Sequence, residues 1–240
     1  MQNSGRTERP TVERSAGRRV SERTLVRAQA GSGLVFAIFV VAHLINTLLA
    51  PLGAATYNSV QGAMRAIYQD PWVEIGLLLG SLLVHLGCGV LRARRRPKGR
   101  PGAHRWQRQS GWVLVVIVIG HSLATRGPSL AYDVWPDFEG VAFSLHWFPS
   151  YFYPYYLLFG IAAAYHGGLG ILRAARVFGW RPKDRSESAG LRGLRRAGWI
   201  ALISFSIALL VSLLAFGGVL FEVENPLNHA YARLYTGFGS

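Results

Sequence analysis

The sequence predicts an all-α integral membrane protein built on a five-helix transmembrane bundle, and three observations lead to that fold class. Half of the 240 residues are hydrophobic, and only 16% are charged. Five stretches of seventeen residues or more carry no charge, which is enough helix to cross a bilayer core of ~30 Å at ~1.5 Å per residue. Lys and Arg gather between these stretches. We therefore expect spans near residues 30–50, 72–92, 109–127, 151–173 and 197–221.

The uneven distribution of basic residues gives the expected topology. Seven arginines precede the first span, eight basic residues separate the second span from the third, and eight separate the fourth from the fifth. Thus 23 of the 26 Lys and Arg lie on one side, called here the basic end. The positive-inside rule places this end in the cytoplasm, so a multi-pass protein of the plasma membrane has its N-terminus inside and its C-terminus outside. The net charge of +14 then favours anionic lipid over nucleic acid.

Three domains follow from this pattern. Residues 1–27 are polar and rich in Arg without an apolar core, so we expect a disordered cytoplasmic N-terminus that is not a cleaved signal. Residues 28–222 form the transmembrane domain, and residues 223–240 form an outer tail. A single cysteine, Cys88, rules out a disulfide within the chain.

The connections between spans carry weaker signals. Residues 51–70 are an outer connection in which Val60, Met64 and Ile67 recur at helical spacing, as in a short helix on the membrane surface. The outer connection at 128–150 is rich in Trp, Tyr and Phe, and we expect it to form a lid at the membrane interface. The fifth span has no ionisable residue, so we expect it to pack against the bundle.

Two internal repeats link the first four spans. The pattern H-x-G-x-G-[VI]-L-R occurs at 85–92 and again at 166–173, each time closing an apolar run. A Ser-Gly-x-Val sequence starts eleven residues before His43 and, in the third span, eleven before His121. The first span therefore resembles the third and the second resembles the fourth. This is the pattern of a duplicated two-helix unit with a pseudo-twofold axis along the membrane normal.

The first four spans carry one histidine each, and their depths sort them into two pairs. His85 and His166, the inner pair, each lie seven residues before an arginine at the basic end. His43 and His121, the outer pair, lie near the opposite boundary. At ~1.5 Å per residue each pair lies ~10 Å inside its own edge, which leaves ~10 Å between the two planes in a ~30 Å core. The pseudo-twofold axis makes the same pairing independently.

Two haem b groups, each held by two axial histidines, fit this arrangement. Ionisable residues inside spans are costly and usually mark function, and a twofold axis through each pair suits a planar group held from both faces. In the alternative, the histidines only form hydrogen bonds between closely packed helices. One Zn or Cu site is not expected, because its ligands must converge at ~2 Å. The small neighbours that leave room for a porphyrin are Ala42, Gly87, Gly89, Gly120, Ser122, Gly167, Gly168 and Gly170.

With these histidines, the N-inside topology and the stretch from Ser32 to Asn46, residues 27–222 resemble a known family. It is the cytochrome b membrane-anchor subunit of succinate:quinone oxidoreductases and quinol:fumarate reductases, in its single-chain, five-helix, di-haem form. The resemblance implies that the inner pair ligates the haem nearer the cytoplasmic subunits and the outer pair the distal haem. Ala164 departs from members of the family that carry a carboxylate in the fourth span for proton transfer.

The resemblance also implies the partners. Electrons would pass between a cytoplasmic flavoprotein subunit, an iron–sulfur subunit and a membrane quinone, in a succinate dehydrogenase or fumarate reductase complex of the respiratory chain or tricarboxylic acid cycle. The chain itself would have no active site for the dicarboxylate. It would act as a non-catalytic electron-transfer subunit, with either direction of electron flow open.

Other polar residues are candidate contacts of the haems or the quinone. Glu74 shares a face with His85 and is a candidate proton acceptor for the quinone, although a carboxylate at a helix N-terminus is the simpler interpretation. Arg126 is a candidate partner of a distal haem propionate. Gln29, Ser32 and Arg173 are candidates for the proximal haem, and each can equally be an anchor at the membrane boundary.

Two other functions are compatible with the sequence. One is the cytochrome b of another membrane oxidoreductase, such as a hydrogenase or a formate dehydrogenase. The other, from a different class, is a haem-free transporter or scaffold, in which the histidines serve helix packing alone.

Overall fold

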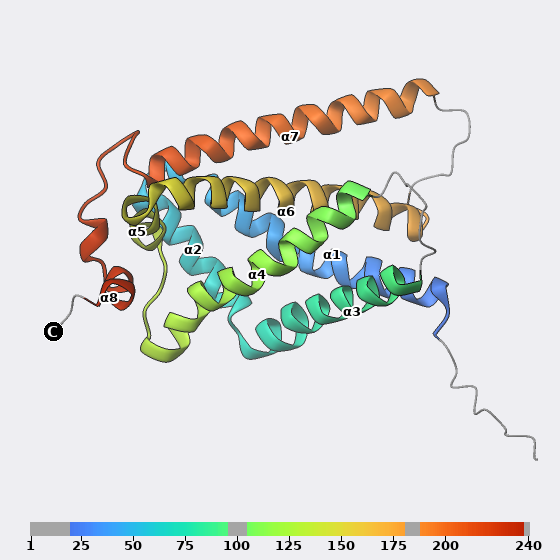
Figure 1. The fold of residues 1–240 in the computed structure, drawn as a ribbon, viewed down its shortest axis with the longest axis horizontal. Helices are drawn as coiled ribbons and strands as arrows, with labels where there is room; N and C mark the ends of the chain where they lie inside the picture. The colour runs from blue at the N-terminus through green and yellow to red at the C-terminus, as the bar shows by residue number, and fades with distance from the viewer. Residues whose placement is uncertain (1–19, 96–104, 181–187, 238–240) are drawn as a thin grey trace, which may run out of the picture.

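The computed structural model describes residues 20–95, 105–180 and 188–237, which form helices joined by turns, with no strand in these ranges (Figure 1). Five helices are long and apolar enough to cross a membrane, which confirms the expected number of spans. They are α1 (Glu22–Thr47), α3 (Gly80–Arg95, which continues a π-helical segment over Trp72–Leu79), α4 (Arg105–Tyr132), α6 (Pro149–Val177) and α7 (Ser188–Phe216).

The first helix starts earlier than expected. Residues 22–27 were assigned to a disordered N-terminus, but α1 begins at Glu22. The hydroxyl oxygen of Ser21 accepts a hydrogen bond from the Thr24 amide at 3.1 Å, which caps the first turn. The guanidinium of Arg92 binds the Glu22 carboxylate at 2.8 Å. The expectation was wrong for these residues because an N-cap and a partner on α3 stabilise polar helix. Residues 1–19 lie outside the described ranges.

Three shorter helices gather toward the end of the bundle opposite the basic end (Figure 1). They are α2 (Ala54–Tyr68), α5 (Phe138–Trp147) and α8 (Ala230–Thr236). A helix was expected in the connection that α2 occupies, whereas no secondary structure was predicted for the outer tail at 223–240, where α8 lies. Tyr57, Phe138 and Phe216 from α2, α5 and α7 meet in a buried aromatic cluster. The burial raises the pKa of Tyr57 well above its usual range.

The helix α4 continues through Pro128, although the third span was expected to end near residue 127. A proline has no N–H, so the Ala124 carbonyl loses its helical partner. The hydroxyl groups of Tyr231 and Tyr235 on α8 donate to this carbonyl at 2.8 and 3.0 Å. Pro128 is therefore accommodated by hydroxyl groups more than a hundred residues away in sequence. Local sequence alone could not indicate it.

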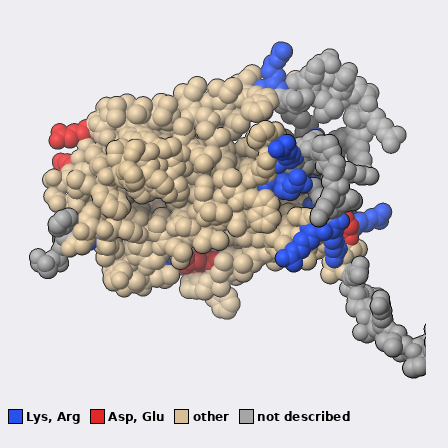
Figure 2. Space-filling model, in the orientation of Figure 1, with Lys and Arg blue, Asp and Glu red and all other residues tan. Residues whose placement is uncertain are grey.

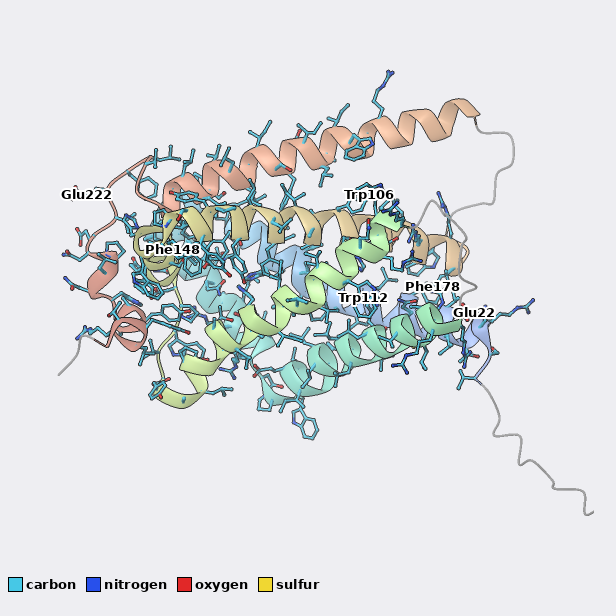
Figure 3. The ribbon with its side chains drawn as sticks, viewed as in Figure 1. Glu22, Trp106, Trp112, Phe148, Phe178 and Glu222 are labelled. Atoms are coloured by element: carbon cyan, nitrogen blue, oxygen red, sulfur yellow. The ribbon has the colours of Figure 1, made fainter. Side chains whose placement is uncertain are left out.

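The fifth span ends at Phe216 rather than at residue 221. Gly217 and Gly218 follow, and Gly218 has φ +76, a conformation that favours glycine. The chain then turns back toward α5 and α8. Figure 3 shows Glu222 at the same end of the molecule as Phe148, while Glu22 and Phe178 lie at the other end.

The packing of the long helices determines where the histidines lie. α1 packs against both α3 and α6, and α4 packs against α6, whereas contact between α3 and α4 is marginal. Large apolar side chains stay exposed along the spans, including Ile38, Val116 and Ile207. Such a surface is unusual for a protein in water and suits the acyl region of a bilayer. Figure 2 shows Lys and Arg gathered at one end of the molecule.

Candidate functional site

The structure brings the four membrane histidines into two pairs of facing rings. The ring centres of His85 on α3 and His166 on α6 lie 6.2 Å apart, with 81° between the ring planes. The ring centres of His43 on α1 and His121 on α4 lie 6.1 Å apart, with 64° between the planes. These are the pairs that depth and symmetry group together in the sequence. The two sites have the same spacing, and each takes its rings from two different helices.

Both rings of the inner pair are oriented by backbone carbonyls. Nδ1 of His85 lies 2.9 Å from the Gln29 carbonyl oxygen on α1, and Nδ1 of His166 lies 3.1 Å from that of Gln107 on α4. A carbonyl can only accept, so each Nδ1 carries the hydrogen, and each Nε2 keeps a lone pair for a metal. The Ser110 hydroxyl also lies 3.3 Å from Nδ1 of His166. Ligating histidines are usually fixed in this way through their second nitrogen.

Two glycines give the inner rings their space. A Cβ atom on Gly33 would lie 2.7 Å from Nδ1 of His85, and one on Gly111 would lie 3.0 Å from Cε1 of His166. Both glycines belong to the repeated Ser-Gly sequence of the first and third spans. Only glycine lets the neighbouring helix approach the imidazole this closely. The same close approach occurs in both two-helix units.

The glycines of the histidine motif divide into two groups. A Cβ on Gly89 would meet the Gln29 side chain at 3.0 Å, and one on Gly170 would meet that of Gln107 at 3.8 Å. In contrast, Cβ atoms on three others would meet nothing within 4 Å, as expected for a surface that has room beside it, and these are Gly87, Gly167 and Gly168.

A hydrogen-bonded network at the basic end, called here the inner rim, joins Gln29, Arg92 and Glu22. The Arg92 guanidinium donates to Oε1 of Gln29 at 2.5 Å and to Glu22 at 2.8 Å. Ser32 donates to carbonyls of its own helix and does not reach the histidine ring in this network. Arg173, which corresponds to Arg92 in the repeat, is half-buried near the end of α6. The structure therefore joins Gln29 to Arg92 and leaves Ser32 bonded locally.

The outer pair is surrounded by aromatic rings. Phe39 stacks on His43 with ring centres 5.8 Å apart, and Phe159 approaches His121 edge-on at 5.0 Å. Within the described ranges, Nδ1 of His43 is buried without a hydrogen-bond partner. The outer rings are thus positioned by packing, whereas the inner rings are positioned by hydrogen bonds.

Glu74 and Arg126, expected near the distal haem and the quinone, bind each other. The guanidinium of Arg126 forms a two-pronged ion pair with the carboxylate at 2.5 and 2.7 Å, and it also donates to the Ser129 hydroxyl at 2.9 Å. Its face lies over the Trp135 ring at 5.7 Å. Both side chains are about three-quarters buried, at 25% and 29% exposure. Forked pairs of this kind are strong and well oriented.

A buried polar chain lies beside the outer pair. The amide of Asn46, one turn after His43, donates to the Gln61 side chain at 2.6 Å, and Gln61 donates to the Tyr68 hydroxyl at 3.4 Å. Burial raises the pKa of Tyr68, which keeps its hydroxyl protonated. Oδ1 of Asn46 is itself buried without a partner in the part of the chain that the structure describes. Buried amides seldom remain unsatisfied, so this atom lies where a further polar group can bind.

Gln107, Gly33 and Gly111 are among the residues of the inner site that the sequence analysis did not select. A signal for them was present. The repeat extends backward to Gln-x-x-Ser-Gly, at 29–33 and 107–111, so Gln107 corresponds to the Gln29 that was selected. Gln107 acts through its backbone carbonyl, which every residue type has, so the residue type does not indicate this role.

In the described residues, no group of three or more His, Cys, Asp or Glu side chains is placed to hold a metal ion. Comparisons with protein-family models, with curated proteins and with solved structures found no match to this chain.

Proposed function

We propose that this chain is a di-haem cytochrome b membrane anchor, which transfers electrons between cytoplasmic flavoprotein and iron–sulfur subunits and a membrane quinone. The complex would be of the succinate dehydrogenase or fumarate reductase type. The observation that carries the proposal is the spacing of two histidine pairs, 6.2 and 6.1 Å between ring centres, on helices that cross a membrane.

The residues present fit a bis-histidine haem. A metal–imidazole bond of ~2 Å and ~1 Å from nitrogen to ring centre, taken on both sides, give a separation of ~6 Å between ring centres. Both observed separations match that value. The inner rings have their Nδ1 atoms occupied, which leaves Nε2 as the ligating atom. A pair joined only by a hydrogen bond between the rings would bring the two nitrogens to ~3 Å, with no need for glycines that admit the ring.

The side chains divide the work between the two sites. A bound haem b supplies reversible exchange of one electron. His85 and His166 hold the inner group, and the Gln29 and Gln107 carbonyls orient the two rings. His43 and His121 hold the outer group among Phe39 and aromatic neighbours that exclude water.

The opposite end of the bundle holds the groups that can handle a proton. Glu74 is the candidate acceptor for a quinone proton, and Arg126 orients its carboxylate through their ion pair. The Tyr68–Gln61–Asn46 chain reaches the neighbourhood of His43 and offers hydrogen-bonding groups to a quinone carbonyl.

The partners would bind at the basic end, which we assign to the cytoplasm, so the N-terminus lies inside and the C-terminus outside. The described arginines at this end include Arg23, Arg27 and Arg92. Their charge favours an acidic subunit surface and anionic lipid, rather than nucleic acid.

Spectra of the purified full-length protein test the proposal. We expect a reduced b-type spectrum and two haems per chain, and a colourless folded preparation would overturn the haem assignment. His85→Ala and His166→Ala should each remove the same one of the two signals, and His43→Ala and His121→Ala should remove the other. His146→Ala, an exposed histidine on α5, is the matched control and should keep both.

Affinity purification from membranes separates this complex from other cytochrome b enzymes. Co-purification of a flavoprotein with succinate or fumarate activity supports the proposal. A hydrogenase or formate dehydrogenase subunit in its place would keep the haem sites and exclude the proposed partners.

A further inference from the structure

A recess of about 410 Å³ opens where α2 meets the start of the second span, and the proposed electron transfer makes no use of it. It is lined by Gly62, Arg65, Ala66, Gln69, Asp70 and Trp135. One side chain of each charge, an amide and an indole therefore face the same space. A haem could not bind there, because the lining contains no histidine.

Arg65 is a half-buried cation on the wall of this recess. It donates to the Pro136 carbonyl at 3.1 Å, and its guanidinium lies over the Trp135 ring at 5.1 Å. The ion pairs formed among the described residues do not include it, whereas its neighbour Arg126 is neutralised by Glu74. Trp135 stacks against both arginines and holds the guanidinium of Arg65 in place. A guanidinium that is held in place and has no direct ion pair among the described residues favours binding of a phosphate group.

Asp70 supplies the opposite charge. Its Oδ1 accepts hydrogen bonds from the Trp72 and Val73 amides at 3.0 and 3.3 Å, so the side chain caps the first turn of the span. The residue is exposed and lines the recess, and the hydrogen bonds of the cap engage its Oδ1. A carboxylate beside a phosphate site repels a simple anion and attracts a ligand whose positive group lies close to its phosphate.

The surroundings of the recess suit an acyl chain. Asp70 lies two residues before the span that begins at Trp72, which places the recess at a membrane boundary. Three large apolar side chains in the same stretch of the chain, outside the lining itself, are strongly exposed, with Ile67 at 69%, Trp72 at 85% and Ile75 at 62%. Tryptophan is the residue most typical of the headgroup level. The polar recess and the apolar strip together have the chemistry of a phospholipid.

We propose that this recess binds the phosphoethanolamine headgroup of a phospholipid in the leaflet opposite the basic end. Arg65 binds the phosphate, Asp70 binds the ammonium group, and the acyl chain lies along Ile67, Trp72 and Ile75. The proposal does not rest on the haem assignment, because none of these residues contacts the four membrane histidines.

Native mass spectrometry of the full-length, detergent-solubilised protein tests it, with phosphatidylethanolamine, phosphatidylglycerol and phosphatidylcholine as probes. We expect phosphatidylethanolamine to bind best. Arg65→Gln should weaken it about tenfold, since a charge-assisted bond to phosphate is lost, and Arg65→Lys should keep part of the affinity. Asp70→Asn keeps the cap and should lower phosphatidylethanolamine to the level of phosphatidylglycerol. Arg233→Gln, an exposed outer arginine, is the control and should change nothing.

Soluble competitors distinguish the source of the ligand. Glycerophosphoethanolamine that competes as well as the lipid would support the headgroup chemistry and reduce the role of the apolar strip. Inorganic phosphate that competes equally would overturn the role of Asp70. The proposal as a whole would be overturned if the Arg65→Gln variant bound the lipid with wild-type affinity. It would also be overturned if a quinone analogue displaced the lipid and the Arg65→Gln substitution caused no loss of lipid affinity.

Discussion

The inner and outer histidine pairs have nearly equal ring spacing, yet different parts of the chain hold them. At the inner pair, each ring is fixed by the carbonyl of a glutamine and by a glycine four residues later, all on one neighbouring helix. At the outer pair, Phe39 and Phe159 pack against the rings, and Nδ1 of His43 has no partner among the described residues.

The inner site is therefore specified by short local motifs, whereas the outer site depends on segments that are distant in the sequence. The inner pair uses two copies of the same short sequence and needs only the four long helices. The outer pair lies nearer the end of the bundle that α2, α5 and α8 occupy, and the contacts of these helices join residues far apart in the chain. We therefore expect the inner site to respond sharply to single substitutions in the repeat and the outer site to respond to changes in the surrounding helices.

The largest effect is expected when a large side chain replaces a glycine that packs against an inner histidine ring. Gly33→Leu would push into the His85 ring, since even a Cβ lies 2.7 Å from Nδ1. We expect loss of one of the two haems, with the outer signal kept, measured by pyridine haemochrome content and redox titration.

The matched control is Gly198→Leu on α7, where a Cβ meets nothing within 4 Å. It should leave both haems in place. Two retained haems in Gly33→Leu would contradict the idea that the glycine admits the ring.

Breaking the Glu74–Arg126 pair is expected to have the next largest effect and should reach only the outer half. Glu74→Gln leaves a mostly buried guanidinium without its carboxylate, which costs about 1–3 kcal/mol of stability. The double variant with Arg126→Gln removes both charges and should recover most of that loss.

Quinone reduction separates the two roles of Glu74. If the carboxylate accepts a proton, electron transfer to quinone stays slow in the double variant even though stability returns. Recovery of both together would assign Glu74 a structural role alone. Thermal unfolding and quinone-reductase rates are the measurements.

The sequence predicted the spans and the pairs because both leave periodic marks. Charge-free runs, arginine clusters and the spacing of His43 and His121 are visible in one dimension. The inner repeat placed His85 and His166 at equal distances from their arginines, and the rings lie together in the structure.

What the sequence could not predict depends on partners distant in the chain. The helix α4 continues past Pro128 because two tyrosine hydroxyls bind the Ala124 carbonyl. Glu74 and Arg126 were assigned to different ligands, although they stand 52 residues apart in the chain and bind each other in the folded protein. Residues 22–27 look like a charged tail until Arg92 on another helix binds Glu22.

A smaller effect is expected at the inner rim. Arg92→Gln removes a positive charge and the hydrogen bond to Gln29, whose own carbonyl orients His85. The midpoint potential of the inner haem should fall. The change should correspond to about 1 kcal/mol at an effective dielectric constant near 20. The outer potential should not move. An equal shift of both potentials would show that Arg92 acts through the overall charge and not through the inner site.

The smallest effect tests whether α8 positions the outer pair, because Ala124 lies in the turn after His121. Tyr231→Phe or Tyr235→Phe alone should change little, since the remaining hydroxyl still donates to the carbonyl. The double variant leaves the carbonyl without a partner beside Pro128, and we expect a loss of about 1 kcal/mol, at the low end because water reaches this end of α4. The loss should be greater than the sum of the single variants and should alter the spectrum of the outer haem only. Additive losses, or an equal change in the inner haem, would place α8 outside the support of the outer site.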